Sequence, residues 1–174
     1  MTMTTDQEKS QKKFVQQQFA PEDFFAVMAM QARYASVIDN DRLEEWPAFF
    51  IEKCHYRITT ANNHSKGYEA SIVFANSRGM LVDRVTALRE ANIFERQAYR
   101  HICGAPVFLS SDNGEIACET SFAVVRIMRD GSSNLFASGR YLDRLVRENN
   151  VLKIRERIAI CDSSRIDTLL ALPL

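Results

Sequence analysis

Apolar side chains recur at helical spacing in the first half of the chain. Over Phe24–Ile38 they form a broad stripe, which predicts a long amphipathic helix with Pro21 in its first turn. A second, shorter helix is expected after Asp41, because Asp41 and Glu44 have the spacing of a capping box. A third helix is predicted over Met80–Phe94, where apolar positions again follow one face.

The second half of the chain changes to the two-residue period of β-strands. Turn sequences around Gly114, Gly131 and Asn149 separate four strand-like runs, at about 99–111, 115–129, 134–147 and 151–161. Runs joined by tight turns pair antiparallel, so we predict a four-stranded meander. Gly139, inside the third run, is expected to mark a bend or bulge. Before the meander, 54–60 is expected to be a strand, 62–67 a polar loop and 72–74 a short strand.

This order of elements is typical of the α+β class, in which helices close one side of a bent sheet. We expect the cone-shaped nuclear-transport-factor-like (cystatin-like) fold, with N-terminal helices packed on a curved, mostly antiparallel sheet. Residues 21–174 are expected to form this single domain, and residues 1–20 a polar extension that is flexible or ordered by a partner. The fold hosts isomerases, dehydratases, binding modules and structural subunits, so it settles no function.

The charge balance argues against two classes of partner. With 22 basic and 22 acidic side chains the formal net charge is zero, so the chain has no basic excess to favour nucleic acid or anionic membranes. No apolar run is long enough to span a membrane, and we expect a cytoplasmic protein. The basic residues are 16 Arg and only 6 Lys, a bias typical of ion pairs and protein interfaces.

Cysteine and histidine spacing predicts neither a metal site nor a disulfide framework. The four cysteines are widely separated, and we expect buried, reduced thiols. His55, His64 and His101 lack the nearby partners that a mononuclear iron or a Rieske cluster needs. No nucleophile elbow or phosphate-binding glycine loop occurs either, so the motifs give almost no support for an autonomous enzyme.

The last strand contains one charge that breaks its alternation. Apolar residues at 152, 154, 158 and 160 alternate with Lys153, Arg155 and Arg157, but Glu156 falls on the apolar side. Two interpretations follow: a buried ion pair with Arg126 or Arg140 on neighbouring strands, or a catalytic carboxylate at the mouth of a cavity. The ion pair is favoured, because most buried charges are structural.

Several stretches in a fixed order carry a family resemblance. They are YASVIDNDRLEEWPAFF (34–50), CHYR (54–57), DRVTALREANIFER (83–96), YRH (99–101), FASG (136–139), YLD (141–143), RERIA (155–159), CDS (161–163) and DTLLALPL (167–174). On these stretches the chain resembles the small, or β, subunits of aromatic-ring-hydroxylating dioxygenases, and within that family it looks most like the terephthalate dioxygenase branch.

The resemblance implies a non-catalytic subunit of an oxidoreductase. Such β subunits form α3β3 hexamers on a β-trimer base. The large α subunit of the family holds a Rieske 2Fe-2S cluster and a mononuclear iron, which add both atoms of O2 to an aromatic ring to give a cis-dihydrodiol. Electrons come from NAD(P)H through a reductase. The family supplies no catalytic motif that could be transferred to this chain, so the resemblance implies no catalytic, cofactor-binding or metal-binding residue here.

Two other functions stay open on the residues alone. A stand-alone isomerase or dehydratase would use an acid and a base drawn from His101, Tyr56, Tyr141 and Glu156. A ligand-binding module would need the same cavity without acid-base geometry. For the subunit hypothesis, arginines in the third helix, after it and on the last strand are the predicted contacts to partner chains: Arg84, Arg89, Arg96, Arg100, Arg155 and Arg157.

Overall fold

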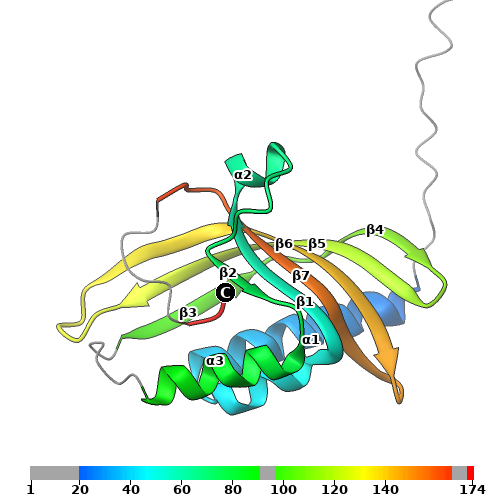
Figure 1. The fold of residues 1–174 in the computed structure, drawn as a ribbon, viewed down its shortest axis with the longest axis horizontal. Coiled ribbons are helices and arrows are strands. Elements are labelled where there is room, and N and C mark those ends of the chain that lie inside the picture. Colours follow the sequence, from blue (N-terminus) through cyan, green and yellow to red (C-terminus); the bar gives the residue numbers. More distant parts are fainter. Residues whose placement is uncertain (1–19, 91–96, 166–171) are drawn as a thin grey trace, which may run out of the picture.

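Helices cover one side of a strongly curved, seven-stranded sheet in the computed structural model, which describes residues 20–90, 97–165 and 172–174 (Figure 1). The predicted α+β class is confirmed. The predicted N-terminal extension lies outside the described residues except for Ala20, which directly precedes the first helix. Among the described residues, no helix is both long and apolar enough to cross a bilayer.

The elements follow the predicted order. The first half contains α1 (Pro21–Asp39), the 3-10 helix η2 (Leu43–Phe49), β1 (Phe50–Thr60), α2 (Ala61–Ser65), β2 (Val73–Ala75) and α3 (Arg78–Glu90). The second half contains β3 (Ala98–Cys103), β4 (Val107–Asp112), β5 (Glu115–Ile127), β6 (Ser133–Glu148) and β7 (Val151–Cys161). The predicted third helix thus ends, in the described chain, at Glu90, and its last predicted turn falls among residues 91–96, outside the description.

The sheet combines a local meander with one long-range pairing. Strands β5, β6 and β7 pair antiparallel in sequence order, as predicted, and β1 adds parallel to β7 to give the order β2-β1-β7-β6-β5-β3. The predicted first run divides into β3 and β4, which both pair with β5. Asn113, Gly114, Gly131, Asn149 and Asn150 have positive φ, and this is why such residues occupy the tight turns.

Two local predictions in the first half are wrong. Asp41 does not cap the second helix, because its φ is positive, and Arg42 is the residue that precedes η2. Its expected capping partner, Glu44, instead accepts hydrogen bonds from Arg89 of α3. The predicted polar loop at 62–67 begins as the short helix α2, because the Thr60 hydroxyl accepts a hydrogen bond from the Asn63 backbone N–H.

A bulge in β7 reverses the direction of the side chains that follow it. Arg144 pairs with Glu156 but Leu145 pairs with Ile154, so Arg155 is an extra residue in β7. Because a one-residue shift exchanges the two faces of a strand, Arg157 points into the interior and Glu156 points away from it. The predicted alternation is therefore wrong beyond Arg155.

The glycine inside β6 is explained by the close approach of β6 and β7, and not by a bulge. Gly139 pairs with Phe122 on one side and Cys161 on the other, whereas the register of β6 shifts elsewhere, at Phe136 against β5. A Cβ at Gly139 would overlap the backbone carbonyl of Ile160 in β7. The bulge in β6 therefore lies at Phe136 and not at Gly139. Gly139 instead allows the backbones of β6 and β7 to lie close together.

We therefore expect Gly139→Ala to lower the free energy of unfolding by about 2–3 kcal/mol, because the added methyl group forces β6 away from β7. Urea unfolding followed by circular dichroism measures this loss. Gly104→Ala is the matched control, since its Cβ would lie 3.6 Å from the Ser121 carbonyl oxygen. Equal losses in the two variants would contradict the role assigned to Gly139.

Candidate functional site

A buried guanidinium occupies the centre of the interior. Arg157 of β7 is 0% exposed, and its Nε and Nη2 donate to the two carboxylate oxygens of Asp143 on β6 at 2.8 and 2.7 Å. Gln31 of α1 completes the group: its Oε1 accepts from Arg157 Nη2 at 2.6 Å, and its Nε2 donates to Asp143 Oδ2 at 2.8 Å. The helix is thereby joined to the sheet by charge-assisted hydrogen bonds.

Two tyrosine rings enclose the same guanidinium. The Arg157 Cζ lies 4.2 Å from the ring centroids of both Tyr34 and Tyr141. Stacking on aromatic faces stabilises a guanidinium that has lost its water. Burial alone would lower the pKa of Arg157, but the Asp143 carboxylate raises it well above the ordinary value. The Arg157 side chain is therefore charged in the folded chain.

The last residue of the chain packs against this group. The hydroxyls of Tyr34 and Tyr56 donate to the Leu174 carbonyl oxygen at 2.9 and 3.1 Å, and the Leu174 N–H donates back to the Tyr56 hydroxyl at 3.1 Å. Leu174 is almost completely buried. Aromatic rings fill the space around it, with Trp46 packed edge-on against Tyr56 and Phe122 stacked on Tyr141.

A second buried polar pair lies where α1 ends. Asp39 accepts hydrogen bonds from the His101 backbone N–H at 3.0 and 3.1 Å and lies 2.6 Å from His101 Nδ1. Both side chains are almost fully buried, and Arg100 approaches the carboxylate at 3.6 Å. This pair fixes the C-terminal end of α1 to β3.

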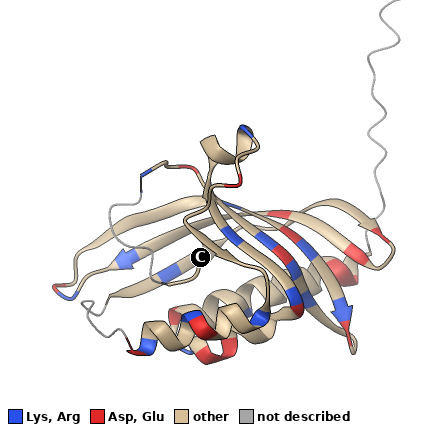
Figure 2. Ribbon diagram, in the orientation of Figure 1, with Lys and Arg blue, Asp and Glu red and all other residues tan. Residues whose placement is uncertain are grey.

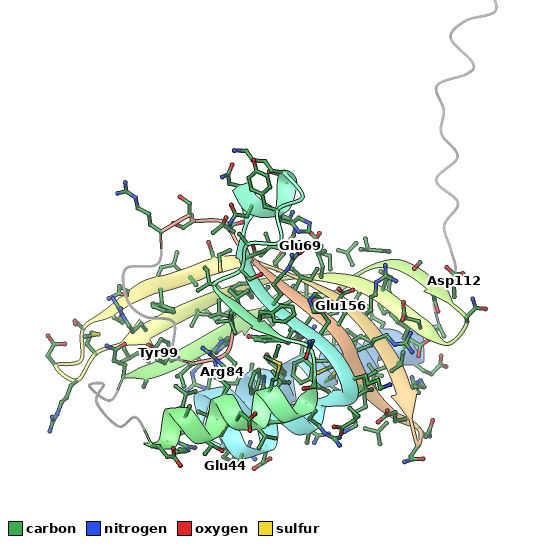
Figure 3. All side chains as sticks on the ribbon, viewed as in Figure 1. Glu44, Glu69, Arg84, Tyr99, Asp112 and Glu156 are labelled. Atoms are coloured by element: carbon green, nitrogen blue, oxygen red, sulfur yellow. The ribbon has the colours of Figure 1, made fainter. Side chains whose placement is uncertain are left out.

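The four acid-base candidates do not form one site. Tyr56 and Tyr141 face the interior, His101 is bonded to Asp39, and Glu156 lies on the other face of β7 (Figure 3). A surface groove of about 460 Å3 between α1, η2 and the β6–β7 turn is lined by none of them. Catalysis by a positioned acid and base would need at least two of these groups around one reacting atom.

The predicted partners of Glu156 are wrong. Glu156 lies 2.9 Å from His55 Nδ1 on β1 and 3.2 Å from Arg144 Nε on β6. Arg140 instead pairs with Glu119 at 3.3 Å, and Arg126 is buried with its guanidinium over the Phe136 ring. The buried ion pair of the sheet is Arg157–Asp143, because the bulge at Arg155 moves Glu156 outward and Arg157 inward.

Basic and acidic residues are interspersed along the helices and strands (Figure 2). Among them, the predicted interface arginines have different environments. Arg100 and Arg155 have side chains that are 61% and 55% exposed. Arg89 binds Asp41 and Glu44, and its hydrogen bonds lower the pKa of Glu44 to about 2. Arg84 is half-buried, lies between α3 and the sheet (Figure 3), and has a buried Nε.

The two remaining predicted interface arginines are Arg157 and Arg96. The prediction that Arg157 is a surface contact is wrong, because Arg157 has no exposed area in the folded chain. Arg96 lies outside the described residues. Three of the predicted contacts, Arg89, Arg100 and Arg155, are therefore exposed in the described chain, and Arg84 is partly exposed.

Sequence reasoning missed Gln31, Tyr34, Asp39 and Leu174 as members of polar clusters. Gln31 offered a signal, because a glutamine within an apolar helix stripe needs a buried partner.

Within the described ranges no group of three His, Cys, Asp or Glu side chains could hold a metal. The cysteines are all free thiols, and burial raises the pKa of Cys118 to about 12 and of Cys161 to about 11.

Comparison with known proteins identifies the family. A sequence model described as "Ring hydroxylating beta subunit" matches residues 33–168. The chain belongs to this family. It is 50% identical over 148 residues to the terephthalate 1,2-dioxygenase terminal oxygenase component subunit beta 1 of Comamonas sp, a match that covers 85% of this chain and 96% of that protein.

Two further relatives support the same family of β subunits. The anthranilate 1,2-dioxygenase small subunit of Burkholderia cepacia is 39% identical over 151 residues, or 87% of this chain and 94% of that protein. The crystal structure of the β subunit of a putative aromatic-ring-hydroxylating dioxygenase from Novosphingobium aromaticivorans superposes with a TM-score of 0.82 at 33% identity, covering 88% of this chain and 97% of that one. The predicted β-subunit resemblance, cone fold and oxidoreductase class are confirmed.

The central ion pair of this β subunit leads to a stability prediction. Arg157→Met leaves the Asp143 carboxylate buried without its counterion, and we expect a loss of about 3–5 kcal/mol in the free energy of unfolding. Arg144→Met, at a guanidinium that is 58% exposed, should cost less than about 1 kcal/mol. Urea unfolding of both variants is the measurement, and similar losses would contradict a special role for Arg157.

The buried thiols of the β subunit should resist modification. With pKa values of about 12 and 11, Cys118 and Cys161 are thiolates in only about one molecule in ten thousand and one in a thousand at pH 8. We expect both to stay unmodified during a brief treatment with Ellman's reagent, and all four cysteines to react in guanidinium chloride. Peptide mass spectrometry identifies the modified residues; rapid native labelling of Cys118 would refute this.

Proposed function

We propose that the chain is the non-catalytic small subunit of a terminal oxygenase that acts on terephthalate or a closely similar aromatic acid. The observation that carries this proposal is the 50% identity to the terephthalate dioxygenase β subunit across nearly the whole of that protein. The internal contacts agree with a structural role, because Tyr56 and His101 are hydrogen-bonded within the chain and Glu156 is paired.

The proposed partner is a large α subunit, with three copies of each chain in an α3β3 hexamer on a β-trimer base. We assign the Rieske 2Fe-2S cluster and the mononuclear iron to that partner. This chain's histidines fit neither centre: His55 faces away from the interior beside Glu156, His101 is held by Asp39, and His64 lies on α2. A cytoplasmic location is part of the same proposal.

The small subunit's contribution is then to hold the large subunits in place. Arg84, Arg89, Arg100 and Arg155 are the proposed contacts, together with Arg96. The exposed guanidinium of Arg155 is hydrogen-bonded on one side to Glu115, which leaves other donors for a partner's carboxylates or carbonyls.

Co-expression with a Rieske-type large subunit tests this function. We expect one complex that contains both chains, has the mass of an α3β3 hexamer and oxidises terephthalate with NAD(P)H and a reductase. The small subunit purified alone should bind no stoichiometric iron and show no turnover. Iron bound at one atom per protomer of the isolated chain would overturn the non-catalytic assignment.

A second experiment tests the interface. Arg155→Lys keeps the charge but removes the planar fork, so we expect the dissociation constant of the complex to rise about tenfold. The unfolding free energy of the small subunit alone should change by less than about 0.5 kcal/mol. Arg42→Lys is the control, because Arg42 pairs with Glu45 outside the proposed contacts. Equal effects of Arg155→Lys on assembly and on folding would count against the interface.

A further inference from the structure

The surface groove between α1, η2 and the β6–β7 turn, which we call the α1 groove, has a lining of two kinds. Its volume is about 460 Å3. One part of the lining is small or apolar and consists of Ala26, Ala29, Met30, Ala48, Phe49 and Leu152. Because alanine side chains are short, they leave room for the main chain of another polypeptide. The other part of the lining is charged.

Cationic side chains outnumber acidic ones around the α1 groove. Arg33, Arg147 and Lys153 line it, whereas Glu45 is the one acid among its described lining residues. The Glu45 carboxylate is already paired with Arg42 at 3.1 Å. The α1 groove therefore has a basic excess, and this excess favours an acidic occupant.

Arg33 is the cation of the α1 groove that is best placed to bind a partner. Its side chain is exposed on α1, and its guanidinium carbon lies 5.9 Å from the ring centroid of Phe49. It has no carboxylate partner within the part of the chain that the structure describes. Arg147, in contrast, is paired with Asp23 at 2.7 Å, and Lys153 donates a hydrogen bond to a backbone carbonyl of η2. Packing on Phe49 orients the Arg33 guanidinium and leaves its N–H groups available for a carboxylate.

The apolar surface of α1 continues beyond the groove. Phe25 and Met28 of this helix are 68% and 41% exposed, and Val151, which lines the groove at the start of β7, is 50% exposed. The helical stretch 26–33 is about 10 Å long, the length of about three residues of extended chain. Exposed apolar side chains over such a length are typical of a contact with another protein, and a small ion would not cover them.

We propose that the α1 groove binds a segment of the large subunit in which acidic residues adjoin an apolar side chain. An acid of this segment pairs with Arg33, and the apolar side chain packs on Phe49 and the alanines of α1. This inference rests on the proposed function, which supplies the partner, but it assigns a surface that none of the proposed contact arginines lines. The chain's own residues 1–19 suit the groove less well, because they contain three lysines and only two acids.

Arg33→Glu in the small subunit, assembled with the large subunit, tests this contact. We expect the dissociation constant of the complex to rise about tenfold or more, because a repulsive charge replaces an attractive one. The melting temperature of the isolated small subunit should shift by less than about 2 °C, since the Arg33 side chain is exposed. Arg33→Gln should give a smaller rise, and added salt should weaken its complex less than it weakens the unmodified one.

Lys66→Glu is the matched control. Lys66 is also an exposed cation, its Nζ lies 5.9 Å from the ring centroid of Tyr68, and it directly follows α2, which is well separated from α1 in Figure 1. We expect the dissociation constant of this variant to stay within about twofold of the unmodified value. An equal rise for Arg33→Glu and Lys66→Glu would reflect the overall charge of the chain and would overturn the assignment of the groove.

A photoreactive benzoylphenylalanine in place of Ala29 identifies the occupant, because the Ala29 side chain is exposed and lines the groove. After irradiation of the assembled complex, peptide mass spectrometry should find Ala29 joined to a large-subunit peptide that contains neighbouring Asp or Glu residues. A cross-link to residues 1–19, to a second small subunit or to a large-subunit peptide without acids would overturn the proposal.

The outcomes for the unmodified chain separate this inference from the proposed function. If the unmodified small subunit forms no complex with a Rieske-type large subunit, the proposed function fails, and the assignment of the groove fails with it. If the unmodified chain assembles and Arg33→Glu assembles with the same dissociation constant, the assignment of the groove alone is overturned.

Discussion

The buried ion pair between Arg157 and Asp143 is the constraint on which the rest of the interior depends. A guanidinium without water must have both its charge and its N–H groups satisfied, and here two strands and a helix supply the partners. Gln31 can reach the pair only if α1 packs against the sheet at this point, and the rings of Tyr34 and Tyr141 flank the Arg157 guanidinium. This charged group, together with the Asp39–His101 pair, thus sets the position of α1 relative to the sheet. Such polar networks specify a single packing arrangement more strongly than apolar contacts do.

The sequence predicted the course of the chain better than the direction of its side chains. Hydrophobic period and turn residues indicated α1, α3, β1 and the β5–β7 meander, because these signals are local. The bulge at Arg155 has no comparable signal, since it depends on how β6 and β7 register across their whole length. For that reason the alternation of β7 predicted the wrong inward charge, and Glu156 was assigned partners that it does not contact. The parallel pairing of β1 with β7 likewise depends on residues about a hundred positions apart.

The paired polar side chains on both faces of the sheet are distributed in a way that suits a structural role. His101 and Asp39 fasten the end of α1 to β3, while Glu156, His55 and Arg144 join three strands on the other face. Each of these groups holds elements together, and none shares a reacting position with another. The family resemblance could be seen in the sequence because it depends on the order of many weak motifs. The roles of single residues could not, because each depends on a contact made across the fold.

The parallel pairing of β1 with β7 also determines the order in which the chain can fold. The meander needs only neighbours in sequence, so β5, β6 and β7 can form as soon as they are synthesised. Strand β1 is made early but has no parallel partner until β7 exists. Its long row of unpaired backbone groups is then a site where another chain can pair during synthesis. Completion of the sheet is consequently a late event, because β1 can be paired on this side only after β7 has been made.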